Sequence, residues 1–447
     1  MLIGQASINL TANILSALLG LLSVFVFTRL FSPHDYGTYL LGTGFASVIS
    51  VFLAGWFRNL VLSGHARNDG TDVRGLVASG FLLSCLTAPI AYGLGVLTGL
   101  GAAAAVAAIA LSIAIAFFDL TQDLIRARLR AFAVMRGTLV RSAGVLCLGV
   151  LVALVSPTGL VLLLSSTAAC LIAILVQSRT AWRGTMMVFD RAELTALARH
   201  GLPLTASLTL LAVSSVTDRF VIANLVGAAD AGRYVAALDL VRQTLMLPAM
   251  SAAAALGFAM ISAHVANVVL GADFREIAAQ TMPIVAVAVI FQILTQQYLH
   301  ASFLLSGRNS FYLINTASII VANVILSCVL VESHGTVGAA WARLGADAIG
   351  FLCALVLSRS AFPVPLPAGR LALVMIAALI MALMVGALDR HLHVGDLTAC
   401  IVLACTGFCS YAALCWLFDI SRLRGRLKSG VALLRTKRAN LTIGPSP

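Results

Sequence analysis

Charged residues are scarce in this sequence. Asp, Glu, Lys and Arg make up 10% of its 447 residues and 60% are hydrophobic, whereas soluble domains carry roughly 25% charged and about 45 to 50% apolar residues. This composition excludes a soluble fold. Apolar runs of about 20 residues, the length that crosses a bilayer as a helix, follow one another from Ile8 to Phe418. The sequence therefore predicts an all-α polytopic membrane protein.

Other absences narrow the structure and the function. The period-2 alternation of a membrane β-barrel is missing, because runs such as Gly101 to Phe118 are apolar on every face. No Walker A motif is present, which argues against ATP hydrolysis. The nine cysteines all lie in apolar runs, where Cys behaves as a small hydrophobe, so neither a disulfide framework nor a metal site is expected. Basic runs interleaved with aromatics are also missing, which argues against a nucleic-acid partner.

The apolar runs predict about fourteen transmembrane helices, with only 37 residues from Tyr234 to Leu270 for the eighth and ninth. The predicted spans are residues 8–28, 39–62, 76–98, 102–124, 138–156, 159–177, 202–225, 234–252, 254–271, 281–305, 311–332, 337–358, 370–388 and 396–418. The predicted parts are a six-helix bundle at 1–200, a second six-helix bundle at 201–360, two additional transmembrane helices at 361–420 and a basic cytoplasmic tail at 421–447.

The distribution of Lys and Arg predicts the orientation. With a cytoplasmic N-terminus, the inside loops and the tail carry twenty basic residues, and the outside loops carry only Arg29, Arg233, Arg275 and Arg390. Cytoplasmic loops are enriched in Lys and Arg. Merging the eighth and ninth spans would reverse every later helix and place the basic tail outside. An even number of crossings and two cytoplasmic termini are therefore expected.

An internal repeat supports the division into two halves. Phe25–Tyr39 aligns with Phe220–Tyr234 at an offset of 195 residues, and Thr121-Gln122 aligns with Thr295-Gln296 at an offset of 174. The matches within the first pair are Asp35 with Asp230, Gly37 with Gly232 and Tyr39 with Tyr234. Many transporters are built from repeated halves, with the substrate site at the interface between them.

Ionisable side chains inside the predicted spans are candidates for function, because they are costly in hydrocarbon. They are Arg58, Asp119, Asp123, Arg141, Asp218, Arg219, Asp239, Arg242, Arg343 and Asp347. An arginine fork can hold a phosphate with two parallel hydrogen bonds, so the functional interpretation is a polar cavity between the halves. The alternative is that these charges snorkel from helix ends or form structural pairs, an interpretation we favour for Arg141, Asp119 and Asp123.

Spacing adds two expectations about these charges. Asp239 and Arg242 are three residues apart on one helix and can pair with each other. Asp218 and Arg219 are adjacent and point in different directions, so at least one of them needs a partner on another helix.

The first span carries a polar stripe. Asn9, Asn13 and Ser16 are spaced four and three residues apart, which places them on one face of a helix. The stripe indicates either a cavity wall or hydrogen bonds between helices. The predicted substrate-binding set is Arg58, Arg219, Arg242, Asn13, Asp218 and Asp239, with no catalytic residue and no metal ligand.

Four stretches carry a family resemblance. TRLFSPHDYGTYLL, which starts at Thr28, resembles a signature of polysaccharide biosynthesis and export proteins, the Wzx-type lipid-linked oligosaccharide flippases of the MOP exporter superfamily. GLPLTASLTLLAVSSVTDRFVIANLVGAADAGRY, which starts at Gly201, is similar to the second-half signature of the same family. VLGADFREIA and SHGTVGAAWA resemble later patterns of that family, so the resemblance extends over nearly the whole chain.

The resemblance implies a MATE-like fold of two six-helix bundles around a central cavity, plus two C-terminal helices. It implies alternating access driven by an ion gradient, with H⁺ or Na⁺ as the candidate ions and no cofactor. The expected function is non-enzymatic: flipping a polyprenyl-pyrophosphate-linked oligosaccharide across the bacterial inner membrane for O-antigen, capsule or exopolysaccharide assembly. Besides membrane lipids, the expected partners are the lipid-linked substrate, a polysaccharide polymerase and glycosyltransferases.

Other functions stay open at the level of sequence. A multidrug cation antiporter of the same superfamily would call for an acidic cavity, and the ionisable residues in these spans are balanced or basic. A large extracytoplasmic loop would favour an integral membrane polymerase or acyltransferase, but the predicted outside turns are short. A scaffold that no longer transports is a third possibility.

Overall fold

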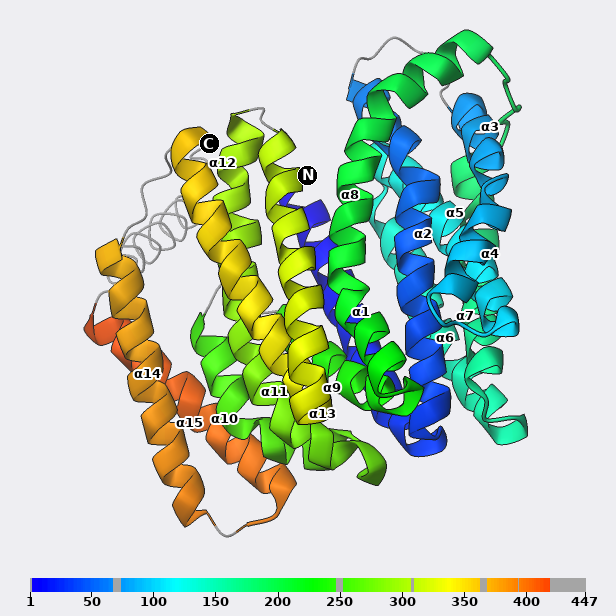
Figure 1. Ribbon diagram of the computed structural model, residues 1–447. Coiled ribbons are helices and arrows are strands. Elements are labelled where there is room, and N and C mark those ends of the chain that lie inside the picture. Colours follow the sequence, from blue (N-terminus) through cyan, green and yellow to red (C-terminus); the bar gives the residue numbers. More distant parts are fainter. Residues whose placement is uncertain are drawn as a thin grey trace, which may run out of the picture.

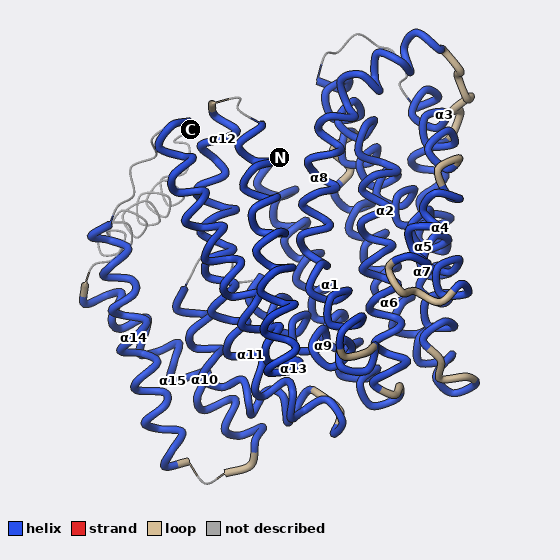
Figure 2. The backbone as a smooth tube through the Cα atoms, in the orientation of Figure 1, coloured by secondary structure: helices blue, strands red, loops and turns tan. Residues whose placement is uncertain are grey.

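The computed structural model describes residues 2–66, 74–246, 252–306, 309–361, 368–392 and 394–418. Every regular element in these ranges is a helix (Figures 1 and 2), so the predicted all-α fold is confirmed. The elements are α1 (Leu2–Leu30), α2 (Pro33–Ala66), α3 (Arg74–Cys85), α4 (Ala88–Leu97), α5 (Ala102–Ala127), α6 (Ala131–Val155), α7 (Gly159–Trp182), α8 (Arg191–Leu225), α9 (Ala228–Met246), α10 (Ala252–Val269), α11 (Ala272–Ile293), the π-helix η1 (Leu294–Leu299), α12 (His300–Leu305), α13 (Asn309–Ala361), α14 (Ala368–His391) and α15 (Asp396–Leu417).

Nearly all described residues of the fourteen predicted spans lie on helical segments; residues 247–251 of the eighth span lie outside the described residues. Within the described ranges, ten helices are long and apolar enough to cross a membrane alone, and α3 with α4 meets the same criteria only as a pair, bent by 44°, as in a broken span or a re-entrant loop. One of the ten, α13, contains two spans, because its backbone turns at Gly335, where φ is +56° and ψ is −139°. The two remaining segments are α9 and α10, with 19 and 18 residues.

The helices form two groups that lie close together at one end of the molecule and diverge at the other (Figure 1). Helices α1 to α7 make the first group, and α9 to α13 make the second, while α8 runs beside α2 and also packs against α13 (Figure 1). Helix α2 packs against both α8 and α9 and so joins the groups. Helices α14 and α15 pack on each other and on α10, where Met381, Val385 and Leu403 form a small apolar core.

The two repeated glycines meet at the end where the groups converge. A methyl group added to Gly37 of α2 would overlap the carbonyl oxygen of Ala228, and one added to Gly232 of α9 would clash with Gly37 and with the carbonyl oxygen of Pro33. The repeat found in the sequence therefore brings two helix N-termini into backbone contact. We call this end of the bundle the closed end.

A second contact holds the closed end together. Arg29 at the end of α1 donates hydrogen bonds to the carbonyl oxygens of Val269 (2.6 Å) and Val268 (2.9 Å), which end α10. The amide of Gly271 donates to Thr28 Oγ1 at 3.1 Å. The last carbonyls of α10 thus receive donors from the first half of the chain, as helix C-termini require.

Helices α9 and α10 form a hairpin based at the closed end. Helix α9 begins there at the Gly232 contact, and α10 returns there to the carbonyls that Arg29 binds. The chain therefore enters α11 from the same end at which it left α8. This geometry preserves the even count of crossings that the charge distribution predicts.

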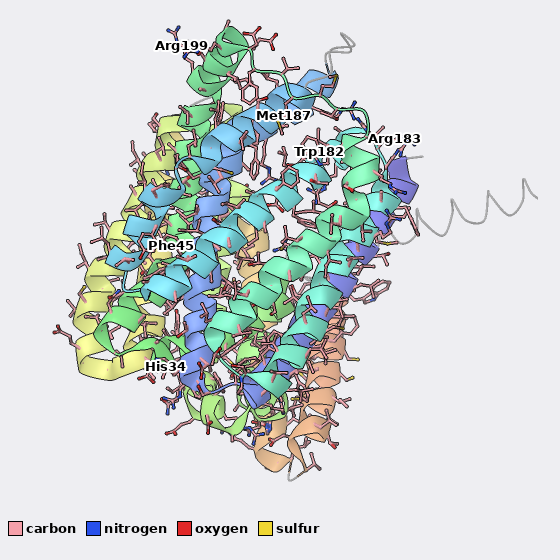
Figure 3. The ribbon with its side chains drawn as sticks, turned by 90° about the vertical axis from the view of Figure 1, so that its right-hand side faces the viewer. His34, Phe45, Trp182, Arg183, Met187 and Arg199 are labelled. Atoms are coloured by element: carbon pink, nitrogen blue, oxygen red, sulfur yellow. The ribbon has the colours of Figure 1, made fainter. Side chains whose placement is uncertain are left out.

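The two ends differ in charge. Figure 3 places Trp182, Arg183, Met187 and Arg199 at the end opposite to His34, which lies at the closed end. The four basic residues predicted to lie outside belong to helix segments at the closed end, three of them near the connections at 31–32, 226–227 and 270–271 and the fourth, Arg390, near the end of α14. The basic turns 128–130 and 183–190 lie at the opposite end.

Candidate functional site

A cavity of about 660 Å³ lies between the two groups of helices. Its lining residues come from α2 and α5 of the first group, from α8 beside α2, and from α9, α11, η1, α12 and α13 of the second group. Small-molecule sites commonly have volumes of about 300 to 1,000 Å³. The cavity reaches Arg126 in the last turn of α5, so it extends toward the end opposite to the closed end.

Six arginine and aspartate side chains line this cavity, contributed by both groups, beside one histidine, His300. The six are Arg58, Asp123 and Arg126 from the first group, and Arg242, Arg343 and Asp347 from the second. Four arginines and two aspartates thus line the cavity, and two further aspartates, Asp119 and Asp218, lie within ion-pair distance of Arg58 and Arg343. Among the described residues, Arg242 has no carboxylate within ion-pair distance, and this arginine favours an anionic ligand.

On the first side, one carboxylate holds two arginines. Arg58 Nε lies 2.6 Å from Asp123 Oδ2, and Arg126 Nη1 lies 3.1 Å from Asp123 Oδ1. Arg58 Nη1 also lies 3.5 Å from Asp119 Oδ2. Asp119 and Asp123 are four residues apart and therefore share a face of α5. Because the Arg58 side chain is 32% exposed, its remaining donors can reach a ligand.

On the second side, Arg343 lies between two buried carboxylates. Its Nε is 2.8 Å from Asp347 Oδ2 one turn along α13, and its Nη1 is 3.5 Å from Asp218 Oδ2 of α8. Tyr234 of α9 donates a hydrogen bond to Asp218 Oδ2 at 3.2 Å. Asp218 is fully buried, and Arg343 and Asp347 are each 4% exposed. Buried ions need such partners, because desolvating each of them costs several kcal/mol.

Arg219 and Asp239 form a separate pair. Arg219 Nη2 lies 3.0 Å from Asp239 Oδ1, so Asp239 binds Arg219 across α8 and α9 and does not pair with its helix neighbour Arg242. The spacing of three residues allowed Asp239 to pair with Arg242, but in the structure the Asp239 carboxylate pairs with Arg219 of α8. Arg219 and Asp218 are not among the side chains that line the cavity between the groups.

Arg242 differs from the other arginines of the cavity. Its Nη1 makes one long hydrogen bond of 3.5 Å to the carbonyl oxygen of Ser215, and its Nη2 is buried without a partner among the described residues. The other three arginines each lie within 4.0 Å of a carboxylate. Buried polar groups normally have a partner, so Arg242 presents a donor that a ligand can satisfy.

Two residues of the predicted set, Asn13 and Asp239, line a second cavity. It has a volume of about 620 Å³ and is lined mainly by α1, α2, α5, α6 and α7. Asn13, Ser16 and Asp239 line it, together with Arg141, whose guanidinium lies 5.1 Å from the centre of the Phe118 ring. The side chain of Asn9 lies outside the described residues. The predicted set is therefore divided: Arg58 and Arg242 line the first cavity, and Asn13 and Asp239 line the second.

Three residues of the first cavity that were left out of the predicted set have a recognisable sequence signal. Asp123 follows Asp119 by four residues, and Asp347 follows Arg343 by four, so each pair shares a helix face. A helix face that carries two charges inside an apolar span needs either a partner helix or water. This spacing is a signal that could have identified Asp123, Arg343 and Asp347 as cavity residues. The position of Asp123 near the predicted end of its helix instead favoured a structural pair.

Most of the chain matches a known protein family. Residues 3–265, more than half of the chain, match the family described as polysaccharide biosynthesis protein. The chain belongs to this family. The resemblance expected from the sequence motifs is thereby confirmed. No curated protein matches this member of the family in sequence.

Solved structures of membrane transporters share the fold of this family member. A lipid II flippase, MurJ, in an inward closed conformation matches with a TM-score of 0.74 at 14% identity, over 92% of this chain and 98% of that chain. An outward-facing multidrug resistance MATE family transporter of the MOP superfamily matches with a TM-score of 0.51 at 13% identity, over 80% and 95% of the two chains. A eukaryotic MATE transporter also gives 0.51 at 13% identity, over 80% and 96%. At these identities the similarity concerns the fold, and the MATE-like polytopic architecture is confirmed.

Proposed function

We propose that this protein is a flippase that moves a polyprenyl-pyrophosphate-linked oligosaccharide across a membrane. The observation that carries the proposal is the cavity between the two groups of helices, with four arginines and an unpartnered donor on Arg242. Membership of the polysaccharide biosynthesis family supports it. So does a fold shared with a lipid II flippase.

The chemistry of the cavity suits a pyrophosphate. Arginine presents planar pairs of donors that match phosphate oxygens, and here Arg58 and Arg126 face Arg242 and Arg343 from the opposite side. A pyrophosphate between them would attract both groups of helices at once. The lipid tail would stay in the bilayer while the headgroup crosses by alternating access. Coupling to H⁺ or Na⁺ belongs to the same proposal.

The charge of the cavity argues against the nearest alternative. A multidrug cation antiporter would hold organic cations, which Arg242 disfavours, because no carboxylate among the described residues lies within ion-pair distance of it. The proposed activity is transport without covalent chemistry. Its substrate would come from glycosyltransferases, and its product would pass to a polysaccharide polymerase for O-antigen, capsule or exopolysaccharide assembly.

We also propose an orientation in the bacterial inner membrane. The closed end would face the periplasm and both termini the cytoplasm, because basic residues gather at the opposite end and in the tail. Topology reporters fused after Arg183 and after Gly430 are expected to read as cytoplasmic, and one inserted after Val394 as periplasmic. A periplasmic signal at Gly430 would contradict the even number of crossings.

The proposed function is tested by complementation. In a bacterial strain that lacks its flippase for undecaprenyl-pyrophosphate-linked glycans, expression of this protein is expected to restore surface polysaccharide. Lipid-linked intermediates that accumulate in the mutant should decline in parallel. Normal protein levels in the membrane without either effect, across hosts that make different glycans, would contradict the proposal.

A further inference from the structure

One turn of helix in the wall of the cavity has unusual geometry. Residues Leu294–Leu299 are π-helical, between α11 and α12. Thr295 and Gln296 of this turn line the cavity, as does Gln292 just before it. Short π-helical segments are rare and are frequent at functional sites, because they displace side chains from the regular helical positions.

The internal repeat provides a built-in comparison for this turn. Thr121-Gln122, the matching pair in the first half, lies in the regular helix α5 and is fully partnered. Trp182 Nε1 donates to Thr121 Oγ1 at 3.1 Å, and Gln122 Nε2 donates to Thr138 Oγ1 at 3.2 Å. In the first half, therefore, this pair of residues holds helices together.

In the second half the same pair has no such role. Thr295 is 2% exposed, and its Oγ1 has no hydrogen-bond partner among the described residues. Thr121 and Thr281, in regular helix, each donate to the carbonyl oxygen four residues earlier at 2.8 Å. Gln296 is exposed to the cavity. The π-turn thus leaves a buried hydroxyl and a neighbouring amide available to a ligand.

These groups differ in chemistry from the arginines of the same cavity. An amide and a hydroxyl are neutral and both donate and accept hydrogen bonds, which suits the hydroxyl and acetamido groups of a sugar. An unsatisfied buried polar atom costs free energy unless a ligand supplies its partner. A site built to bond a ligand hydroxyl also rejects analogues that lack it.

We propose that Thr295 and Gln296, with Gln292 beside them, form the subsite that binds the sugar next to the pyrophosphate and so determine which glycan is accepted. This inference rests on the proposed flippase function and adds the residues that select the substrate. The arginines bind the anion common to all such lipids, and the π-turn reads the neutral sugar.

The test compares carriers that share the pyrophosphate and differ in the sugar. Purified protein in lipid nanodiscs is titrated with undecaprenyl pyrophosphate, bare or bearing one hexose, one N-acetylhexosamine or one 6-deoxyhexose. The wild-type protein is expected to bind at least one sugar-bearing carrier about tenfold more tightly than the bare one, since two net hydrogen bonds give roughly that ratio. Gln296→Ala and Thr295→Val should each cut this preference severalfold and leave affinity for the bare carrier unchanged.

Two controls separate the subsite from folding and from the anion site. Gln122→Ala, in the matching pair of the first half, should lower thermal stability and keep the sugar preference. Arg242→Lys should weaken binding of every carrier, bare or not. A wild-type protein without preference for any sugar, or a preference that survives both Gln296→Ala and Thr295→Val, would overturn the subsite. Failure of the wild type to bind any carrier would instead overturn the proposed function.

Discussion

Replacing Arg242 by lysine is expected to abolish most polysaccharide export while the protein remains at its normal level in the membrane. Lysine keeps the positive charge but loses the planar pair of donors that a guanidinium offers to phosphate. No carboxylate among the described residues lies within ion-pair distance of Arg242, so no structural pair is broken by the change. The measurement is surface polysaccharide in the complemented strain, with the membrane-embedded protein quantified beside it.

Arg219 supplies the matched control for this prediction. It lies on α8 near the same charge network, but it pairs with Asp239 at 3.0 Å and does not line the cavity between the groups. Arg219→Lys can keep that single contact, and export should stay close to normal. Arg219→Ala would leave Asp239 without its partner and lower the amount of folded protein. Normal export from Arg242→Lys would refute the role of that arginine in binding pyrophosphate.

The largest loss of stability is expected from Arg343→Ala. This change leaves Asp218 and Asp347 buried without the guanidinium that lies between them. Removing one partner of a buried ion pair typically costs about 3 to 5 kcal/mol, comparable to much of the stability of an average domain. The expected result is a sharp drop in membrane-embedded protein and in its thermal unfolding temperature in detergent.

A compensating variant tests the cause of that loss. Arg343→Met combined with Asp347→Leu removes both charges of the contact within α13, and such replacements are often tolerated. Asp218 would keep its hydrogen bond from Tyr234. The double variant should recover part of the lost protein but not transport. Equal stability of Arg343→Ala and the wild type would show that the arginine does not neutralise these carboxylates.

The sequence predicted the architecture well because membrane-spanning helices follow a simple rule of length and polarity. The short pair α9 and α10 was predicted from the apolar runs together with the charge distribution, and both are helices in the structure. The repeat also located a contact in space: Gly37 and Gly232, matched by offset, touch each other at the closed end. The sequence could not show that α13 breaks at Gly335 through a positive φ, although the predicted spans 311–332 and 337–358 placed a connection there.

The site was harder to predict, because pairing between helices depends on their rotation. Spacing along α9 allowed Asp239 to pair with Arg242, but α8 presents Arg219 to that carboxylate and leaves Arg242 facing the cavity. The π-helical turn was also hidden, since no residue type marks it in the sequence. The binding roles of the residues predicted from the sequence, and of the residues that the cavity adds to them, stay predictions.

Translocation in reconstituted vesicles tests the central claim most directly. Proteoliposomes containing the purified protein are loaded with a fluorescent undecaprenyl-pyrophosphate-linked saccharide, and a membrane-impermeant quencher added outside reports how much lipid reaches the outer leaflet. The account predicts that the wild-type protein moves the lipid well above empty vesicles and that Arg242→Lys does not, although both reconstitute equally. Translocation by Arg242→Lys at the wild-type rate, or none by the wild type with any saccharide, would contradict it.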